Sequence, residues 1–223
     1  MSEVLGMIPA RGGSKGVIKK NIRNVGGKPL IYWTISALKL SKYCTEFAVS
    51  TDDPEIAEIS KKGGANIVFR PQHLAEDETP MIEAIKHFIT SYKNKYKYLA
   101  LLQPTAPMRT ADDIDMAIKL FLETKPNSLI SVYKVEDAHP ARMYSIFGGH
   151  LKPIYQEPPG SLRQQLPDIY HRNGAIYICD INYLLSSNRL WDDRPIPFIM
   201  PKDRSYNIDD EQDLKIVDIL MSK

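Results

Sequence analysis

Residues 3–17, EVLGMIPARGGSKGV, join a short apolar run to a basic turn that contains three glycines. The run over residues 3–9 has the composition of a buried parallel strand, and the turn begins where such a strand would end. Closely spaced glycines let backbone N–H groups converge on one point, and Arg11 and Lys15 place positive charge beside them. The stretch therefore predicts a strand that ends at an anion site, most often one for phosphate; a flexible basic surface turn is the alternative.

The rest of the chain continues this alternation of apolar strands and amphipathic helices. Strand-like runs follow at residues 46–53, 66–71, 98–104, 128–135, 175–181 and 195–200. Helical spacing of apolar residues occurs within residues 28–43, 54–63, 80–93, 111–124 and 210–221. Strands separated by helices of this length are typical of a mostly parallel sheet with helices on both faces. We therefore predict an α/β fold in a single domain over residues 1–223.

The regular alternation breaks between residues 136 and 172. This segment is rich in proline, arginine and aromatic residues and contains the glycine pair at 148–149. We interpret it as an insertion that leaves the sheet and rejoins it, because no continuous helical or strand period runs through it.

The composition limits the classes of partner. The 223 residues carry 29 Lys and Arg against 27 Asp and Glu, a formal net charge of +2. This balance does not indicate nucleic acid or an anionic membrane as a partner, so any basic site is local. Cys44 and Cys179 are too few for a disulfide framework and are not spaced as metal pairs. With no signal-peptide pattern and no apolar stretch of about 20 residues, we expect a cytoplasmic protein.

Polar residues follow the predicted strands at their carboxyl ends. Arg11 to Lys15 follow the first strand, Asp52 and Asp53 the second, Arg70 the third, and Gln103 lies at the end of the fourth. Ligands of open parallel sheets bind at this edge, so the convergence favours an enzyme. Taken singly, each residue also has a structural explanation. One of the two aspartates can equally well be the N-cap of the helix that follows, and Arg70 can be a solvated cation at the end of a strand. The glycine spacing fits neither a Walker A loop nor a dinucleotide fingerprint.

Seven motifs in a fixed order carry a resemblance to a known family. They are IPARGGSKGVIKKNI, VSTDD, RPQHLAEDE, LLQPTAPMRT, RQQLP, RNGAIYI and SYNIDDEQDL. Together they resemble the acylneuraminate cytidylyltransferases, or CMP-sialic acid synthetases, and cover nearly the whole chain. The resemblance implies a Rossmann-like nucleotidyltransferase in which residues 136–172 form a dimerisation arm. It also implies transfer of CMP from CTP to an N-acylneuraminate with release of diphosphate, serving cell-surface polysaccharide biosynthesis.

For the nucleotide, the resemblance implies that the basic loop holds the triphosphate. The matching positions in the loop are Arg11, Gly13, Ser14 and Lys15. Asn21 matches the position that the family uses against the cytosine base, and Arg70 matches one that contacts the nucleoside. An amide both donates to and accepts from the edge of cytosine, which suits the choice of this base.

For the sugar acid, Gln103 matches a position that hydrogen-bonds the incoming sugar. Arg142 and Arg163 match basic positions of the sugar site, and arginine suits a planar carboxylate.

One position of the sugar site departs from the sialate-using members. Those members carry an arginine two residues before the Asn-Gly pair, whereas this chain has His171 there, followed by Arg172, and keeps Asn173. The identity of the sugar therefore stays open among N-acylneuraminic, legionaminic, pseudaminic and eight-carbon ketodeoxyoctonic acids.

The family also implies a metal ion. Members commonly hold Mg²⁺ with an Asp-x-Asp pair near the C-terminus, where this chain has Asn207 and Asp209. Mg²⁺ prefers oxygen ligands and keeps several waters, so we expect Asp209 as a ligand, Asn207 as a partial one, and Mn²⁺ as a substitute. Arg11, Lys15 and Asp209 are the expected catalytic group. Asn207 also raises the alternative of a nucleotide-binding scaffold that has lost catalysis.

The resemblance finally implies a homodimer in which the inserted arm reaches over the site of the partner. The expected partners are thus CTP, an acidic sugar and a second copy of the chain, without nucleic acid or a membrane.

Overall fold

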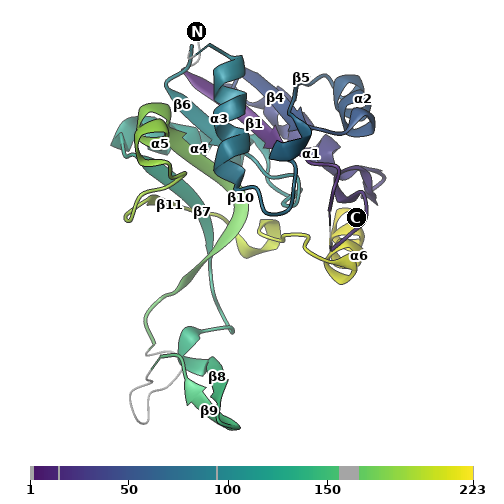
Figure 1. Ribbon diagram of the computed structural model, residues 1–223. Coiled ribbons are helices and arrows are strands. Elements are labelled where there is room, and N and C mark those ends of the chain that lie inside the picture. The colour runs from purple at the N-terminus through teal and green to yellow at the C-terminus, as the bar shows by residue number, and fades with distance from the viewer. Residues whose placement is uncertain (1–2, 15, 94, 156–165, 223) are drawn as a thin grey trace.

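A seven-stranded sheet forms the centre of the computed structural model, which describes residues 3–14, 16–93, 95–155 and 166–222 (Figure 1). The strands lie in the order β11-β7-β10-β6-β1-β4-β5. Their bounds are β1 (Val4–Pro9), β4 (Glu46–Thr51), β5 (Asn66–Phe69), β6 (Tyr98–Leu101), β7 (Ser128–Lys134), β10 (Tyr170–Asp180) and β11 (Ile196–Ile199). β10 is antiparallel to β6 and β7, and the other pairs are parallel. The prediction of a mostly parallel sheet is confirmed.

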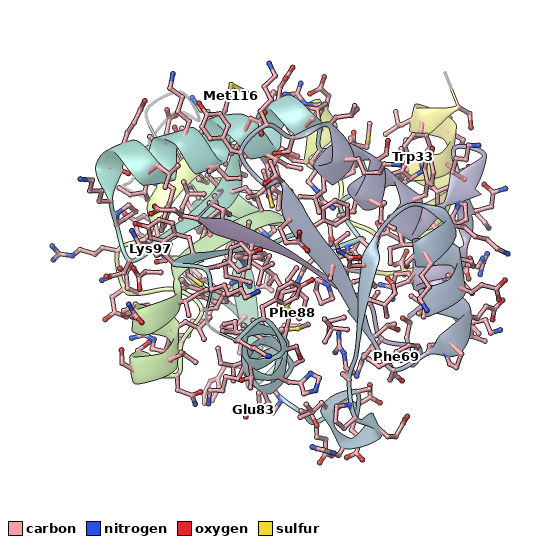
Figure 2. All side chains as sticks on the ribbon, turned by 90° about the horizontal axis from the view of Figure 1, so that it is seen from above. Trp33, Phe69, Glu83, Phe88, Lys97 and Met116 are labelled. Atoms are coloured by element: carbon pink, nitrogen blue, oxygen red, sulfur yellow. The ribbon has the colours of Figure 1, made fainter. Side chains whose placement is uncertain are left out.

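Helices cover both faces of this sheet. They are α1 (Leu30–Leu40), α2 (Pro54–Lys62), α3 (Met81–Ser91), α4 (Ala111–Thr124), α5 (Ile181–Ser187) and α6 (Glu211–Met221). One apolar core joins the sheet to α1, α2 and α4, and a second joins its other face to α3 and α5. Figure 2 shows the sheet between α4, which carries Met116, and α3, which carries Phe88. Among the described residues, no helix combines the length and apolar character needed to cross a membrane.

Helix α6 packs away from the main sheet and fixes the last part of the chain beside the glycine turn. Its Leu214 and Val217 share a small apolar cluster with Val17 and Ile208. This cluster is separate from the two sheet cores, and it holds Ile208 beside Val17, which directly follows the glycine turn.

Two elements differ from the sequence prediction. Helix α5 was not predicted, because seven residues with Ile181 and Leu184 as their buried positions are too short to show a helical period. Strand β10 begins at Tyr170, five residues earlier than predicted, because Tyr170 to Arg172 pair with β7 ahead of a register shift. Gly174 in that shift has a φ of +74°, a conformation that glycine adopts without strain.

The inserted segment leaves the sheet as an arm (Figure 1). Its hairpin consists of β8 (Tyr144–Phe147) and β9 (His150–Pro153), joined by Gly148 and Gly149. Both glycines have positive φ, as tight two-residue hairpin turns require. Phe147 is 79% exposed and Ile146 77% exposed.

Candidate active site

The glycine turn after β1 is held in place by the aspartates that follow β4. The amide of Gly12 donates to Oδ1 of Asp52 at 3.0 Å, while Asp53 caps the N-terminus of α2. A Cβ on Gly12 would lie 2.7 Å from Oδ2 of Asp53, and one on Gly16 would collide with the backbone oxygen of Asp209. A Cβ on Gly13 would meet open space, so this backbone is accessible to a ligand. The structure thus resolves the role of the aspartate pair as loop anchor and helix cap.

A cleft of about 380 Å³, the loop cleft, opens beside this turn. It brings together residues predicted from four separate motifs, namely Arg11, Ser14, Asn21, Arg70, Gln103, Asn207 and Asp209. Their positions agree with the convergence expected at the carboxyl ends of parallel strands. Gly13 lies in the turn beside the cleft, and Lys15 lies outside the described residues.

Arg11 is already paired with a carboxylate. Its Nη2 lies 2.6 Å from Oδ1 of Asp77, and its Nη1 donates to the backbone oxygen of Ala75 at 3.3 Å. Both partners belong to the loop between the short helix η2 (Gln72–Leu74) and α3. A phosphate that uses Arg11 must therefore compete with Asp77 or share the guanidinium with it.

Arg70 is a buried cation in the wall of the cleft, with 6% of its surface exposed. Its Nη2 donates to the backbone oxygen of Ser50 at 2.6 Å, and its Nε has no partner among the described residues. Burial lowers the pKa of Arg70, while nearby Asp52 raises it. A charged donor with spare capacity at the wall of a cleft suits an anionic or acceptor-rich ligand.

Asn21 and Lys20 tie the turn to its surroundings. Nδ2 of Asn21 donates to the backbone oxygen of Arg11 at 3.0 Å, which closes the turn. Nζ of Lys20 donates to the backbone oxygens of Ile208 at 2.8 Å and Asp209 at 3.2 Å. These bonds join the start of the chain to the segment that carries the predicted metal ligands.

The predicted metal ligands lie side by side. Nδ2 of Asn207 donates to Oδ2 of Asp209 at 2.9 Å, and Oδ1 of Asn207 is buried without a partner among the described residues. A carboxylate beside an orphaned amide oxygen is a donor set of the hard type that Mg²⁺ takes. Within the described part of the chain, no three His, Cys, Asp or Glu side chains gather as metal ligands. The residues therefore fit a metal that takes its remaining ligands from phosphates and water.

A second pocket of about 490 Å³, the β10 pocket, adjoins the loop cleft. The two share Gln103, Asn207 and Asp209 in their linings. Because the two hollows share this wall, a ligand in the loop cleft and a ligand in the β10 pocket can approach each other at these three residues.

Aromatic rings support the cationic side of the β10 pocket. The guanidinium carbon of Arg172 lies 4.8 Å from the ring centre of Trp191, within cation–π distance. Trp191 in turn stacks on Tyr177, with ring centres 5.8 Å apart, and His171 lies 5.5 Å from the ring of Tyr133. The two predicted basic residues of β10 are thus held by rings rather than by carboxylates.

Asn173 lies in the wall of the β10 pocket, and its amide is fully engaged by the protein. Its Oδ1 accepts from Oγ of Ser131 at 2.6 Å and from the amide of Ala175 at 3.1 Å. Its Nδ2 contacts Oγ of Ser205 at 2.9 Å and Sδ of Met200 at 3.3 Å. An amide has two donor hydrogens and two acceptor sites, so the structure gives Asn173 a scaffold position rather than a free contact for a sugar.

Arg142, one of the two basic residues predicted in the insertion, is not brought into either hollow. Arg142 ends the short helix η3 (Pro140–Arg142) at the root of the arm, beside Lys134 and His139. Arg163 lies outside the described residues. Among the described residues of one chain, the predicted sugar site is therefore assembled without Arg142.

Five residues of the site were not singled out from the sequence. Lys20, Arg109 and Tyr177 fall inside the quoted motifs, which were the available signal. Tyr133 and Trp191 lie in no motif. Tyr133 lines the β10 pocket because β7 pairs with β10, and Trp191 supports the pocket through its contacts with Arg172 and Tyr177.

The sheet, the glycine turn at its carboxyl edge and the paired hollows define an α/β nucleotidyltransferase. A family model described as cytidylyltransferase matches residues 5–146, and the chain belongs to this family. The chain is 34% identical to the CMP-N,N'-diacetyllegionaminic acid synthase of Campylobacter jejuni, over all of this chain and 96% of that protein.

Two further comparisons agree with this family. The chain is 32% identical to the N-acylneuraminate cytidylyltransferase of Escherichia coli and spans 53% of the length of that protein. A CMP:2-keto-3-deoxy-manno-octonic acid synthetase solved with CTP superposes with a TM-score of 0.75, covering 99% of both chains at 16% identity. That likeness shows the fold.

Proposed function

We propose that this protein transfers CMP from CTP to a nonulosonic sugar acid and releases diphosphate. The observation that carries the proposal is the pair of adjoining hollows that share Gln103, Asn207 and Asp209 in a chain of the cytidylyltransferase family. One hollow offers a basic glycine turn, and the other offers a cation held on aromatic rings. The names of two relatives, the CMP-N,N'-diacetyllegionaminic acid synthase and the N-acylneuraminate cytidylyltransferase, refer to acids of this class.

CTP takes the loop cleft in this proposal. The open backbone at Gly13 and the side chains of Arg11, Ser14 and Lys15 bind the phosphates. Arg70 contributes its buried charge beside the nucleoside, and Asn21 lies where a base can be read. Electrostatic stabilisation of the transition state by fixed groups of this kind is usually the largest contribution to such catalysis.

The sugar acid takes the β10 pocket. Arg172 presents its guanidinium from Trp191 and binds the sugar carboxylate, while Gln103 binds a hydroxyl or the acyl amide at the shared wall. His171 beside Tyr133 replaces the arginine of sialate-using members and shapes the far side. We therefore propose N-acylneuraminic, legionaminic or pseudaminic acid as the substrate class, with the β10 pocket deciding among them.

The reaction is an in-line displacement at the α-phosphorus. The anomeric oxygen of the sugar forms a bond to the α-phosphorus as the bond from that phosphorus to the bridging oxygen of the β-phosphate breaks. Diphosphate leaves, the hydroxyl proton is released, and we assign no side chain as its acceptor. The work of the protein is to align the two substrates across the shared wall and to neutralise phosphate charge.

Asp209 with Oδ1 of Asn207 would hold Mg²⁺, or Mn²⁺ in its place, beside the phosphates. A bound divalent ion supplies charge neutralisation on the phosphates and lowers the pKa of a coordinated hydroxyl. Lys20 keeps both ligands at the cleft through its bonds to the backbone of Ile208 and Asp209.

A second copy of this chain completes the site. The arm exposes Ile146, Phe147 and Leu151 on a two-stranded hairpin, which is marginally stable without a covering surface. Arg142 at the root of the arm lies outside the hollows of its own chain, so a role at a sugar carboxylate requires the site of the partner. Sedimentation of Phe147→Glu tests this arrangement: we expect a monomer that has lost activity, and an active dimer would contradict it.

The function is tested by diphosphate release from CTP and Mg²⁺ with each sugar offered separately. The panel holds N-acetylneuraminic, legionaminic, pseudaminic and ketodeoxyoctonic acids, with UTP and GTP as nucleotide controls. We expect release with CTP and one nonulosonic acid. Saturable CTP binding without release, across the panel and with Mn²⁺ as well, would instead identify a nucleotide-binding scaffold.

A further inference from the structure

Arg109 is a buried cation in the wall behind the two hollows. It lies between β6 and α4 with 3% of its surface exposed. Its Nη1 donates to the backbone oxygens of Gln103 at 2.8 Å and Ala175 at 2.9 Å. Its Nη2 donates to the backbone oxygen of Gln103 at 2.8 Å and also contacts Oγ1 of Thr34. One guanidinium thus joins α1, the loop after β6, and β10.

The two carbonyls that Arg109 binds belong to irregular backbone. Gln103 follows the end of β6 at Leu101, and Ala175 lies inside the register shift of β10. Buried carbonyl groups require donors, and a regular ladder does not supply them at a loop or a bulge. The planar fork of arginine reaches both with fixed geometry, which the single ammonium of lysine does not match.

This clamp determines where the side chain of Gln103 lies. A Cβ placed on Gly174 would lie 3.0 Å from Oε1 of Gln103 and 3.5 Å from Oδ1 of Asn207. The bulge at Gly174, the Gln103 amide and the Asn207 amide therefore meet at one point, on the wall that the two hollows share. A shift of the Gln103 backbone relative to β10 moves this meeting point.

Burying a cation here is costly. The Nε of Arg109 has no partner among the described residues, and burial lowers the pKa of this group to about 9, with Asp113 nearby opposing the shift. Well-packed apolar side chains often stabilise an interior as much as a buried charge does. Packing alone therefore does not explain an arginine at this position, whereas simultaneous orientation of two carbonyls does.

We propose that Arg109 is a positioning residue for the acceptor sugar, fixing Gln103 against the β10 bulge so that the sugar lies in line with the nucleotide. The inference rests on the proposed function, since it takes the β10 pocket as the sugar site. Arg109 touches neither substrate in this account. Its effect reaches the reaction through the main chain of Gln103 and Ala175.

The test compares Arg109→Lys and Arg109→Met with the unmodified protein in steady-state kinetics, varying the sugar and CTP separately. We expect kcat/KM for the sugar to fall about 100-fold in both variants, the size of loss that small misplacements produce. The KM for CTP is expected to change far less, because the glycine turn of the loop cleft is anchored by Asp52 and Asn21 and not by Arg109. Hydrogen exchange should rise at residues 103–106 and 173–177 and stay constant in the glycine turn.

A matched control separates positioning from general loss of stability. Ile118→Val or Ile118→Ala in α4, chosen to match the thermal midpoint of the arginine variants, should leave the sugar KM unchanged. If Arg109→Met fails to fold, Thr34→Val removes one acceptor from the same guanidinium, and Thr34→Ser restores it. Thr34→Val should raise the sugar KM and Thr34→Ser should return it to the original value.

The inference is overturned if the sugar parameters of the arginine variants are unchanged, or if the Ile118 control loses sugar affinity to the same extent. It is equally overturned if kcat/KM for the sugar and kcat/KM for CTP fall to the same extent. The proposed function fails in a different way, through an unmodified protein that uses none of the sugars, and the hydrogen-exchange comparison still tests the clamp in that case.

Discussion

The loop cleft and the β10 pocket are built in opposite ways. The loop cleft is built around a glycine turn of consecutive residues after β1, which is anchored by hydrogen bonds such as Gly12 to Asp52 and Asn21 to Arg11. The β10 pocket takes its shape from a bulged antiparallel strand, a ring stack and the tail before α6. The glycine turn is a local backbone structure to which strand-end residues are added, whereas the β10 pocket depends throughout on packing between distant segments.

The contrast indicates where each kind of specificity resides. A turn that needs glycine at Gly12 and Gly16 for steric reasons tolerates few substitutions, so the nucleotide chemistry is fixed there. The aromatic and basic side chains of the β10 pocket can change without disturbing the turn, since among the described residues the two hollows share Gln103, Asn207 and Asp209 alone. Changes in the β10 pocket are therefore expected to alter the sugar and leave the nucleotide unaffected.

The largest effect is expected where the two hollows meet. Asp209→Asn removes the carboxylate beside Asn207 and should lower kcat by about 100- to 1,000-fold, as loss of a group that stabilises transition-state charge does. Diphosphate release at saturating substrates measures the loss, and CTP binding without a divalent ion should be retained.

Asn207→Asp is the matched variant for this position. It adds a second carboxylate beside Asp209, so half-saturation should occur at a lower Mg²⁺ concentration. Activity of both variants that is independent of the Mg²⁺ concentration would contradict the assignment of these residues as metal ligands.

The next effect sharpens the contrast between the hollows. Arg172→Met removes the cation held on Trp191 and should lower kcat/KM for the sugar by about 30- to 100-fold, the value of a charge-assisted hydrogen bond. Trp191→Leu should give a smaller loss of the same kind, because the guanidinium loses its support. Kinetics at varied sugar and fixed CTP measure the loss. A rise in the KM for CTP alone would show that Arg172 binds the nucleotide and not the sugar.

The sequence predicted the loop cleft more completely than the β10 pocket for a physical reason. The glycines and cations of the turn are adjacent in sequence, and the strand-end residues follow parallel strands whose carboxyl ends meet at one edge, so their grouping was visible. Asn173 was predicted at the sugar, yet its position in the bulge directs its amide to Ser131 and Ser205, a network that no linear pattern encodes. Arg109 and Trp191 acquire their roles from a register shift and a ring stack.

The tail that carries Asn207 and Asp209 gives a pH-dependent prediction. The side chain of Asp113 accepts a hydrogen bond from the amide of Thr110, the N-cap residue of α4, and pairs with Arg204 just before this tail at 2.8 Å. Burial would raise the pKa of Asp113, but hydrogen bonds from Arg204 and Thr110 hold it below its ordinary value. The carboxylate thus stabilises the fold above its unfolded pKa of about 3.9, and this stability is lost as the pH falls through the lower folded pKa.

Thermal unfolding of Asp113→Asn across pH measures this contribution. The variant should be less stable by about 2 kcal/mol at neutral pH, the cost of breaking a buried charged contact. The difference from the unmodified protein should begin to shrink below about pH 4, where the carboxylate of the unfolded chain protonates, and should be lost once the pH has fallen through the lower pKa of the native carboxylate. A difference that stays constant down to pH 2 would show that the loss comes from packing and not from the charge.

The smallest effect concerns the loop cleft. Asp77→Asn weakens the ion pair with Arg11 and leaves the guanidinium to a phosphate, so CTP should bind about fivefold more tightly, in line with the modest value of exposed pairs. Calorimetric titration with CTP gives the affinity, with Glu78→Gln on the same loop as the control. Weaker binding by Asp77→Asn alone would mean that Asp77 orients Arg11 for the nucleotide instead of competing with it.

The arm shows the other limit of sequence reasoning. Its composition predicted an insertion, and the hairpin with its exposed Phe147 agrees with that prediction. Arg142 was assigned to the sugar by position alone, and the structure leaves it at the arm root, where the fold of one chain does not bring it to the β10 pocket. The sequence alone does not indicate whether such a residue would contribute to the site of its own chain or to that of a partner chain.

The most direct test of cytidylyl transfer across the shared wall is a phosphorus NMR time course with CTP, Mg²⁺ and a nonulosonic acid. We predict that the three CTP resonances give way to diphosphate and one phosphodiester resonance of a CMP-sugar, with one acid of the panel and only when sugar is present. Loss of CTP without sugar, or CTP left unchanged by every acid although it binds, would contradict the account.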